Sequence, residues 1–132
     1  MPNTKMISYW VNSSDRDYQV MIDLFKKGHY TWSLFIGHLV IEKLLKAVYS
    51  KKYIKNPPLI HDLLRLSEKS DVEVDEEQKD ILDTITTFNI QARYEDYKLE
   101  FYNKCTRDFT QKWISSIKEF RAWPKQNHLN QY

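Results

Sequence analysis

Glycine and proline are scarce in this chain, with two glycines and four prolines among 132 residues. Six such residues is far below ordinary usage, which is roughly 12% of a chain. Sheet proteins need these residues in their turns, because the turns require a positive or a preset φ. We therefore expect long helices and few short connections. The scarcity also excludes P-loop and Rossmann phosphate-binding loops, which need clustered glycines.

Charge, cysteine content and hydropathy narrow the class further. Twenty basic residues nearly balance eighteen acidic ones, so the net charge of +2 gives no general case for nucleic-acid binding. The single cysteine, Cys105, cannot form an internal disulfide, which favours a reducing compartment. No apolar run approaches the roughly 20 residues that span a bilayer, and no signal peptide is evident. We expect a cytoplasmic protein without a membrane partner.

Hydrophobic periodicity predicts one helical domain over residues 1–132, with its core between about 12 and 122. Ser13-Ser14-Asp15 is expected to cap the first helix, and Gly28 to end it. Residues 91–100 lack periodicity, and the tail after Trp123 is expected to fray. The predicted fold is an all-α, antiparallel up-and-down bundle of four or five helices, over residues 14–27, 31–51 (capped by Thr31), 61–66, 75–90 and 103–123.

The second of these helices is apolar around most of its circumference. Such a helix belongs at the centre of a bundle or in an interface, and it therefore favours a homodimer. Gly37 lies inside it, where glycine costs about 1 kcal/mol relative to alanine, and this indicates a close approach by another helix.

Three polar residues, His38, Glu42 and Lys46, form a narrow seam on this helix, at spacings of four residues. Glu42 and Lys46 are expected to form an ion pair, within the chain or at a dimer seam. His38 either bonds near the core or lines a ligand cleft. His38 and Glu42 alone do not supply the three protein ligands of a catalytic metal site, so we expect neither a metal nor a cofactor.

Four sequence blocks resemble the HEPN domain family in their order and spacing. They are Gly28-His29-Tyr30, the segment from His38 to Ala47, His61-Asp62-Leu63, and Ala92-Arg93-Tyr94. The resemblance covers about residues 12–122 and implies a helical bundle that usually dimerises. It also implies a place beside a small nucleotidyltransferase, frequently in a two-gene toxin–antitoxin module. Catalytic members are metal-independent endoribonucleases with an arginine followed, after four to six residues, by a histidine.

This chain departs from that catalytic motif. Arg93 is present, but Lys98, Leu99 and Glu100 occupy the window where the histidine belongs, and no histidine lies between His61 and His128. Asp96 could accept a proton, and Tyr97 could act only with a strongly lowered pKa. An aspartate or glutamate so near an arginine is more typical of a salt bridge, so Arg93 either pairs with Asp96 or Glu95 or binds a phosphate. Cys105, close to Lys104 and Arg107, could have a lowered thiol pKa.

Three hypotheses follow. The leading one is a dimeric, non-catalytic module that binds a nucleotide, an RNA phosphate or a nucleotidyltransferase partner, with Arg93, His38 and Lys46 as the candidate ligand contacts. The second is a ribonuclease with a degenerate motif, for which Arg93, Asp96 and Tyr97 are the candidate catalytic residues. The third is a purely structural partner protein.

Overall fold

The computed structural model describes residues 4–130 and 132, and all regular structure in this part of the chain is α-helical. The expected all-α class is confirmed. Two short helices accompany four longer ones, so the described helices number six rather than four or five. They are α1 (Thr4–Lys26), α2 (Tyr30–Tyr53), α3 (Leu63–Lys69), α4 (Glu76–Gln91), α5 (Glu95–Lys104) and α6 (Arg107–Asn127).

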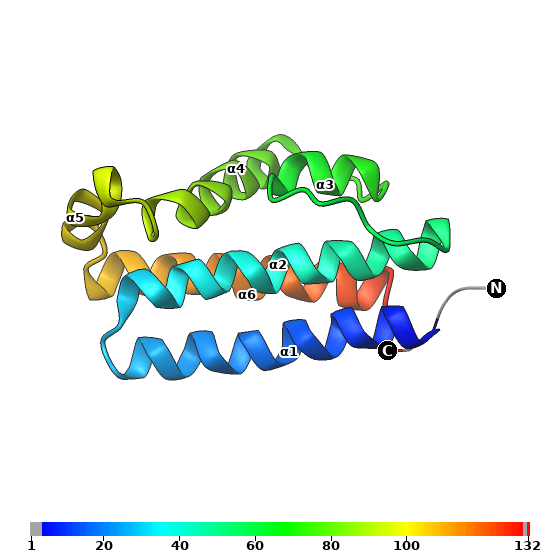
Figure 1. The fold of residues 1–132 in the computed structure, drawn as a ribbon, viewed down its shortest axis with the longest axis horizontal. Helices are drawn as coiled ribbons and strands as arrows, with labels where there is room; N and C mark the ends of the chain where they lie inside the picture. The colour runs from blue at the N-terminus through cyan, green and yellow to red at the C-terminus, as the bar shows by residue number, and fades with distance from the viewer. Residues whose placement is uncertain (1–3, 131) are drawn as a thin grey trace.

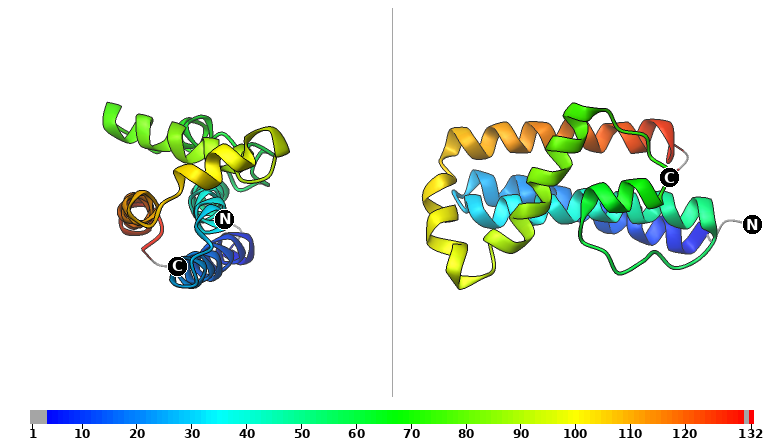
Figure 2. Two further views of the ribbon diagram at one scale, coloured as in Figure 1. Left: turned by 90° about the vertical axis from the view of Figure 1, so that its left-hand side faces the viewer. Right: turned by 90° about the horizontal axis from the view of Figure 1, so that it is seen from above.

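Helix α2 lies in the middle of the molecule. It forms an antiparallel pair with α1, α6 runs alongside, and α3, α4 and α5 lie on the side away from α1 (Figure 1). Seen from above, α4 crosses the long helices steeply (Figure 2). Because α2 contacts each of the other five helices, its apolar circumference is covered within one chain over most of its length, and Trp32 near its start stays exposed. The central position is confirmed, and the apolar circumference by itself does not require a second copy.

The connection between α1 and α2 is short because of one glycine. Gly28 adopts φ 81°, in the left-handed region that glycine enters without a Cβ clash. Its N–H donates to the carbonyl of Phe25, and the N–H of His29 donates to that of Leu24. The predicted glycine at the end of the first helix is confirmed. No helix in the described residues is long and apolar enough to cross a membrane.

Gly37 lies where α2 packs tightly against both α1 and α6. A Cβ added at Gly37 would lie 2.5 Å from Cδ1 of Ile117 on α6 and 3.0 Å from Sδ of Met21 on α1. The predicted close approach is confirmed, and a side chain at this position would push two buried residues aside.

The beginning of α1 was predicted wrongly. The helix starts at Thr4, and Ser13 and Ser14 lie buried within it. Ser14 does not cap a helix: its hydroxyl donates to the carbonyl of Val40 on α2, at 2.7 Å. Ile7 and Val11 continue the apolar spacing toward the N-terminus, and both are buried, so the pattern extends about three turns further than expected.

The start of α2 also differs from the prediction. Its N-cap residue is His29 rather than Thr31, and no side chain caps it. The later starts agree better with the sequence. Asp62 caps α3, Asp75 forms a capping box with Gln78 at the start of α4, and Thr106 caps α6.

Helix α5 and the C-terminal segment were not expected to be ordered helix. The one buried residue of α5 is Phe101, whose ring lies 5.6 Å from that of Phe88, and a single anchor leaves no periodic stripe in the sequence. Helix α6 continues through the buried Pro124 to Asn127, and Leu129 is buried beyond it. The helix therefore extends four residues past Trp123, where the sequence predicted that the tail would begin to fray.

Candidate functional site

Arg93 lies at the surface just beyond the end of α4, and Asn89 of that helix holds its side chain in place. Its Nε donates to the backbone carbonyl of Asn89 at 2.9 Å, and its Nη2 donates to the Asn89 side-chain oxygen at 3.0 Å. The guanidinium also lies over two rings, 5.5 Å from the centroid of Phe35 and 5.6 Å from that of Tyr94. Two hydrogen bonds and two rings thus orient an exposed cation.

The expected salt bridge of Arg93 with Asp96 or Glu95 is wrong. Glu95 instead pairs with Lys98, Nζ to Oε1 at 3.2 Å, and no described carboxylate lies within ion-pair distance of Arg93. The reason is that α5 begins at Glu95, so both acids occupy its first turn, where the helix dipole favours negative charge. Asp96 and Tyr97 are exposed there. The charge of Arg93 is left without an acidic partner among the described residues.

A groove lies at the start of α2, and Ala92, the residue before Arg93, is part of its lining. One hollow, of about 160 Å³, is lined by Thr31, Trp32, Ala92, Lys98 and Tyr102. A second, of about 300 Å³, shares Thr31 and Tyr102 with the first and continues toward α6; its other lining residues are Gly28, Tyr30, Asn103, Cys105 and Thr106.

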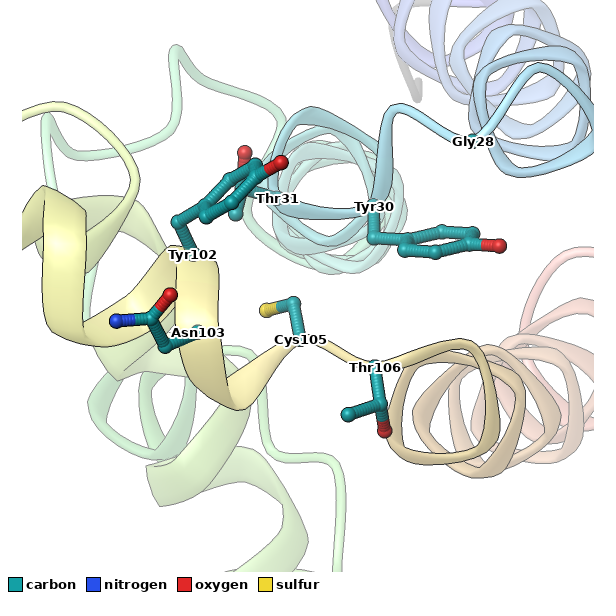
Figure 3. Close-up of a pocket in the computed structure, with 7 residues that line it drawn as sticks. All are labelled: Gly28, Tyr30, Thr31, Tyr102, Asn103, Cys105 and Thr106. Atoms are coloured by element: carbon teal, nitrogen blue, oxygen red, sulfur yellow. The ribbon is translucent and has the colours of Figure 1, made fainter.

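Figure 3 shows the second hollow, with the Tyr102 ring beside Thr31. No acidic residue lines either hollow. The ring of Trp32 meets that of Phe35 edge-on, with centroids 5.7 Å apart, and so connects the groove to the ring beneath Arg93. Tyr102 was not identified from the sequence as a lining residue, because α5 was not predicted.

Cys105 opens onto this groove but is not activated. Burial raises the pKa of its thiol to about 12, and the nearby charge of Lys104 opposes this shift only in part. The possibility of a lowered pKa is therefore contradicted. Lys104 directs its Nζ over the ring of Phe109, so desolvation dominates at the sulfur.

The polar seam of α2 is a connected network in the interior. His38, Glu42 and Lys46 are all buried. Lys46 Nζ lies 3.2 Å from Glu42 Oε2, which confirms the predicted ion pair, and 5.2 Å from the ring centroid of Trp10. The partner that the sequence did not indicate is His61, whose Nδ1 lies 2.8 Å from Glu42 Oε1.

His38 is tied to the same residue. Its Nε2 lies 2.8 Å from the backbone carbonyl of His61, and because a carbonyl only accepts, Nε2 carries the proton. Desolvation lowers the pKa of His38, and the charges of His61 and Arg93 lower it further, against the opposing effects of the carbonyl bond and Glu42. Nδ1 of His38 is buried without a hydrogen-bond partner among the described residues, which suits the neutral ring.

The predicted site residues are thus brought into one region but at different depths. Phe35, His38, Glu42 and Lys46 follow one another on one side of α2, with Arg93 over the first of them. His38 and Lys46 are buried and bonded within the chain, so direct contact with a ligand at the surface is left to Arg93.

The family comparison agrees with this fold. The model of the HEPN domain family matches residues 7–128, nearly the whole chain. No curated protein and no solved structure matches it. The match begins within α1 and ends just after α6, so it covers both the polar seam and Arg93. The chain belongs to the HEPN domain family.

Proposed function

We propose that this HEPN domain binds RNA or a nucleotide through a phosphate group, with Arg93 as the phosphate ligand. The observation that carries the proposal is the state of Arg93: an exposed guanidinium, oriented by Asn89, without an acidic partner among the described residues. The planar fork of arginine donors matches phosphate oxygens, and a preoriented side chain loses less entropy on binding.

The neighbouring groove supports a ligand that carries a base as well as a phosphate. Trp32 is 44% exposed and Tyr102 70% exposed, and both line the acid-free hollow beside Ala92. Unpaired bases stack on aromatic rings, and each such contact contributes about 1–3 kcal/mol. Rings next to an unpaired arginine are the elements that a single-stranded RNA or a nucleotide requires.

Binding of a fluorescent 20-nucleotide single-stranded RNA, with ATP as competitor, tests the proposal. Arg93→Ala should weaken RNA binding about tenfold or more, because a hydrogen bond to a charged group contributes about 1.5–3 kcal/mol. The matched control is Arg65→Ala, which removes another exposed arginine from α3.

Equal losses in the two variants, or no saturable binding by the natural chain, would refute the assignment. Displacement of the RNA by ATP would identify a mononucleotide site, and no displacement would identify a site for the strand.

Membership of the HEPN family also suggests which partners this chain binds. We propose a homodimer, a nucleotidyltransferase partner and a role in a toxin–antitoxin module, as is common for this family. Apolar side chains exposed near α5, namely Ile90, Tyr97 and Leu99, support an interface there. Sedimentation that shows only a 16.0 kDa species at micromolar concentration would refute the dimer. A nucleotidyltransferase gene next to this one, whose product co-purifies with the chain, would support the module.

A further inference from the structure

The second hollow of the groove, of about 300 Å³, lies where two helices begin. Helices α2 and α6 both start at the same end of the molecule, and α5 lies at that end (Figure 1). Figure 3 views the hollow nearly along α2 and α6. All three helices contribute to its lining, with Tyr30 and Thr31 from α2, Asn103 from α5 and Thr106 at the start of α6. The hollow therefore adjoins the positive ends of two helix dipoles.

The lining of this hollow carries no ionised side chain. Cys105 is neutral as well, because burial raises the pKa of its thiol to about 12. The two cations next to the hollow along the chain are directed onto rings. Lys104 Nζ lies 5.6 Å from the ring centroid of Phe109, and the Arg107 guanidinium lies 5.6 Å from that of Phe25. A phosphate would lack a counter-charge here, whereas a neutral group that hydrogen-bonds needs none.

Two neighbouring residues of α5 offer the hollow a ring and an amide. Tyr102 is 70% exposed, so one face of its ring is available for stacking. Asn103 follows it, and neither side chain forms a hydrogen bond with another described residue. Figure 3 shows the Asn103 amide with its oxygen toward Tyr102 and Thr31 and its nitrogen on the far side. A planar ligand that stacks on Tyr102 therefore meets the acceptor of the amide first and its donor beyond it.

The opposite rim of the hollow donates hydrogen bonds. The N-cap residue His29 makes no side-chain cap bond, so the first N–H groups of α2, at Tyr30 and Thr31, lack an acceptor within the helix. These N–H groups and the dipole of α2 favour an oxygen in front of them. Together with Asn103, the rim presents a donor, an acceptor and a donor in that order.

Uracil is the RNA base whose edge is complementary to this order. Its O2, N3–H and O4 present an acceptor, a donor and an acceptor. Cytosine carries an amino donor in place of O4 and an acceptor at N3, and adenine has no carbonyl oxygen. Guanine follows its single oxygen with two donors. With any of these three bases, two donors or two acceptors would face each other, and an unpaired polar group would remain.

We propose that the second hollow is a uracil-selective base subsite, in which the base stacks on Tyr102 and pairs its edge with Asn103. The assignment rests on the proposed RNA-binding function of Arg93 and names the base that this function selects. The smaller hollow shares Thr31 and Tyr102 with this one and extends to Ala92, the residue before Arg93. The two hollows therefore form one path between the base subsite and the neighbourhood of the phosphate ligand.

Binding of fluorescent 20-nucleotide oligouridine and oligocytidine to the full chain tests the subsite. The two strands share the backbone and the pyrimidine ring and differ only at the base edge. The natural chain should bind oligouridine about tenfold more tightly, which is the discrimination of one bidentate contact. Asn103→Ala should bring the two Kd values within about twofold of each other. The matched control is Asn12→Ala, at an exposed asparagine of α1, which should leave the ratio unchanged.

Three further variants separate the contacts. Asn103→Asp keeps the volume of the side chain and should invert the preference, because a carboxylate accepts from the cytosine amino group and repels uracil O4. Tyr102→Ala should weaken the binding of both strands about tenfold, since stacking tolerates any base. Arg93→Ala should weaken both strands equally and keep the ratio of the two Kd values, because a phosphate contact carries no sequence information.

The possible outcomes separate the two proposals. Equal binding of the two strands by the natural chain, with a loss in Arg93→Ala, overturns the base subsite and leaves the binding function intact. A preference for oligouridine that survives both Asn103 variants overturns the subsite as well. A preference that depends on Asn103, without any loss in Arg93→Ala, supports the subsite and overturns the phosphate ligand. Absence of binding to either strand overturns both.

Discussion

The contact at Gly37 allows the sharpest test of the packing. In Gly37→Ala the new Cβ would lie 2.5 Å from Cδ1 of Ile117 and 3.0 Å from Sδ of Met21. Carbon atoms pack at about 3.5–4.0 Å, so Cδ1 must move by about 1 Å, and Ile117 is fully buried. Such overpacking costs about 1–3 kcal/mol, while alanine in place of a helical glycine contributes about 1 kcal/mol.

We therefore expect Gly37→Ala to lower the free energy of unfolding by about 1 kcal/mol. For a chain of 132 residues that is a drop in Tm of roughly 3–4 °C. Ile117→Val removes Cδ1, the atom in closest conflict, and should by itself cost about 0.5–1.5 kcal/mol. In the double variant the contact at 2.5 Å is gone and the one with Sδ of Met21 at 3.0 Å remains, so the combined loss should fall short of the sum by at least about 0.5 kcal/mol.

Urea denaturation followed by circular dichroism measures the free energy of unfolding of the natural chain, the two single variants and the double variant, which together form a double-mutant cycle. Additive losses, or a Gly37→Ala chain that gains the full benefit of alanine, would refute the packing described for α2 and α6. A change in the dependence of the unfolding free energy on urea concentration would instead indicate an altered unfolded state.

Two further predictions concern the polar seam. The pKa of His38 in the folded chain lies below the ordinary value of about 6.5, so the unfolded chain binds the extra proton first. The free energy of unfolding therefore falls as the pH drops through and below that value, by up to about 1.4 kcal/mol per pH unit. His38→Gln keeps a donor for the His61 carbonyl but cannot titrate, so its free energy of unfolding should fall less between pH 7 and pH 5 than that of the natural chain. His128, whose pKa is also lowered, contributes equally in the natural chain and in the variant. Equal decreases in the two proteins would contradict the role given to His38. Lys46→Met leaves the buried Glu42 carboxylate without its cation and should lower the free energy of unfolding by about 3–5 kcal/mol. The control Lys118→Met, at an exposed position of α6, should change it by less than about 0.5 kcal/mol. Similar effects of the two variants would show that the ion pair is not buried in solution.

Much of the fold could be predicted from local chemistry. The all-round apolar pattern of α2 indicated its central place, and Gly28 and Asp75 mark real helix ends. Helix α5 was missed because one buried residue, Phe101, anchors it. The beginning of α1 was misplaced because Ser14 is chemically suited to cap a helix. In the structure its hydroxyl instead donates to the carbonyl of Val40 on α2, a contact between helices that the local sequence does not indicate.

The candidate site was predicted in part for a similar reason. Arg93 and the seam residues could be identified from spacing and from the family resemblance, but their partners could not. The acids next to Arg93 in sequence belong to α5, while Asn89, four residues earlier, holds the guanidinium. Glu42 meets His61 across a connection without helical periodicity, so no pattern along the chain relates the two.

The buried sulfur of Cys105 makes the protein suitable for site-specific reporting of its own motions. It is the one thiol in the chain, and it lies at the junction of α5 and α6, protected by burial and by its high pKa. Only the thiolate reacts with alkylating reagents, so modification in native buffer must wait until this junction opens. The modification rate, followed by mass spectrometry without introduced labels, would therefore measure the local opening free energy beside the groove. A nucleotide or RNA that stabilises the closed groove would slow it.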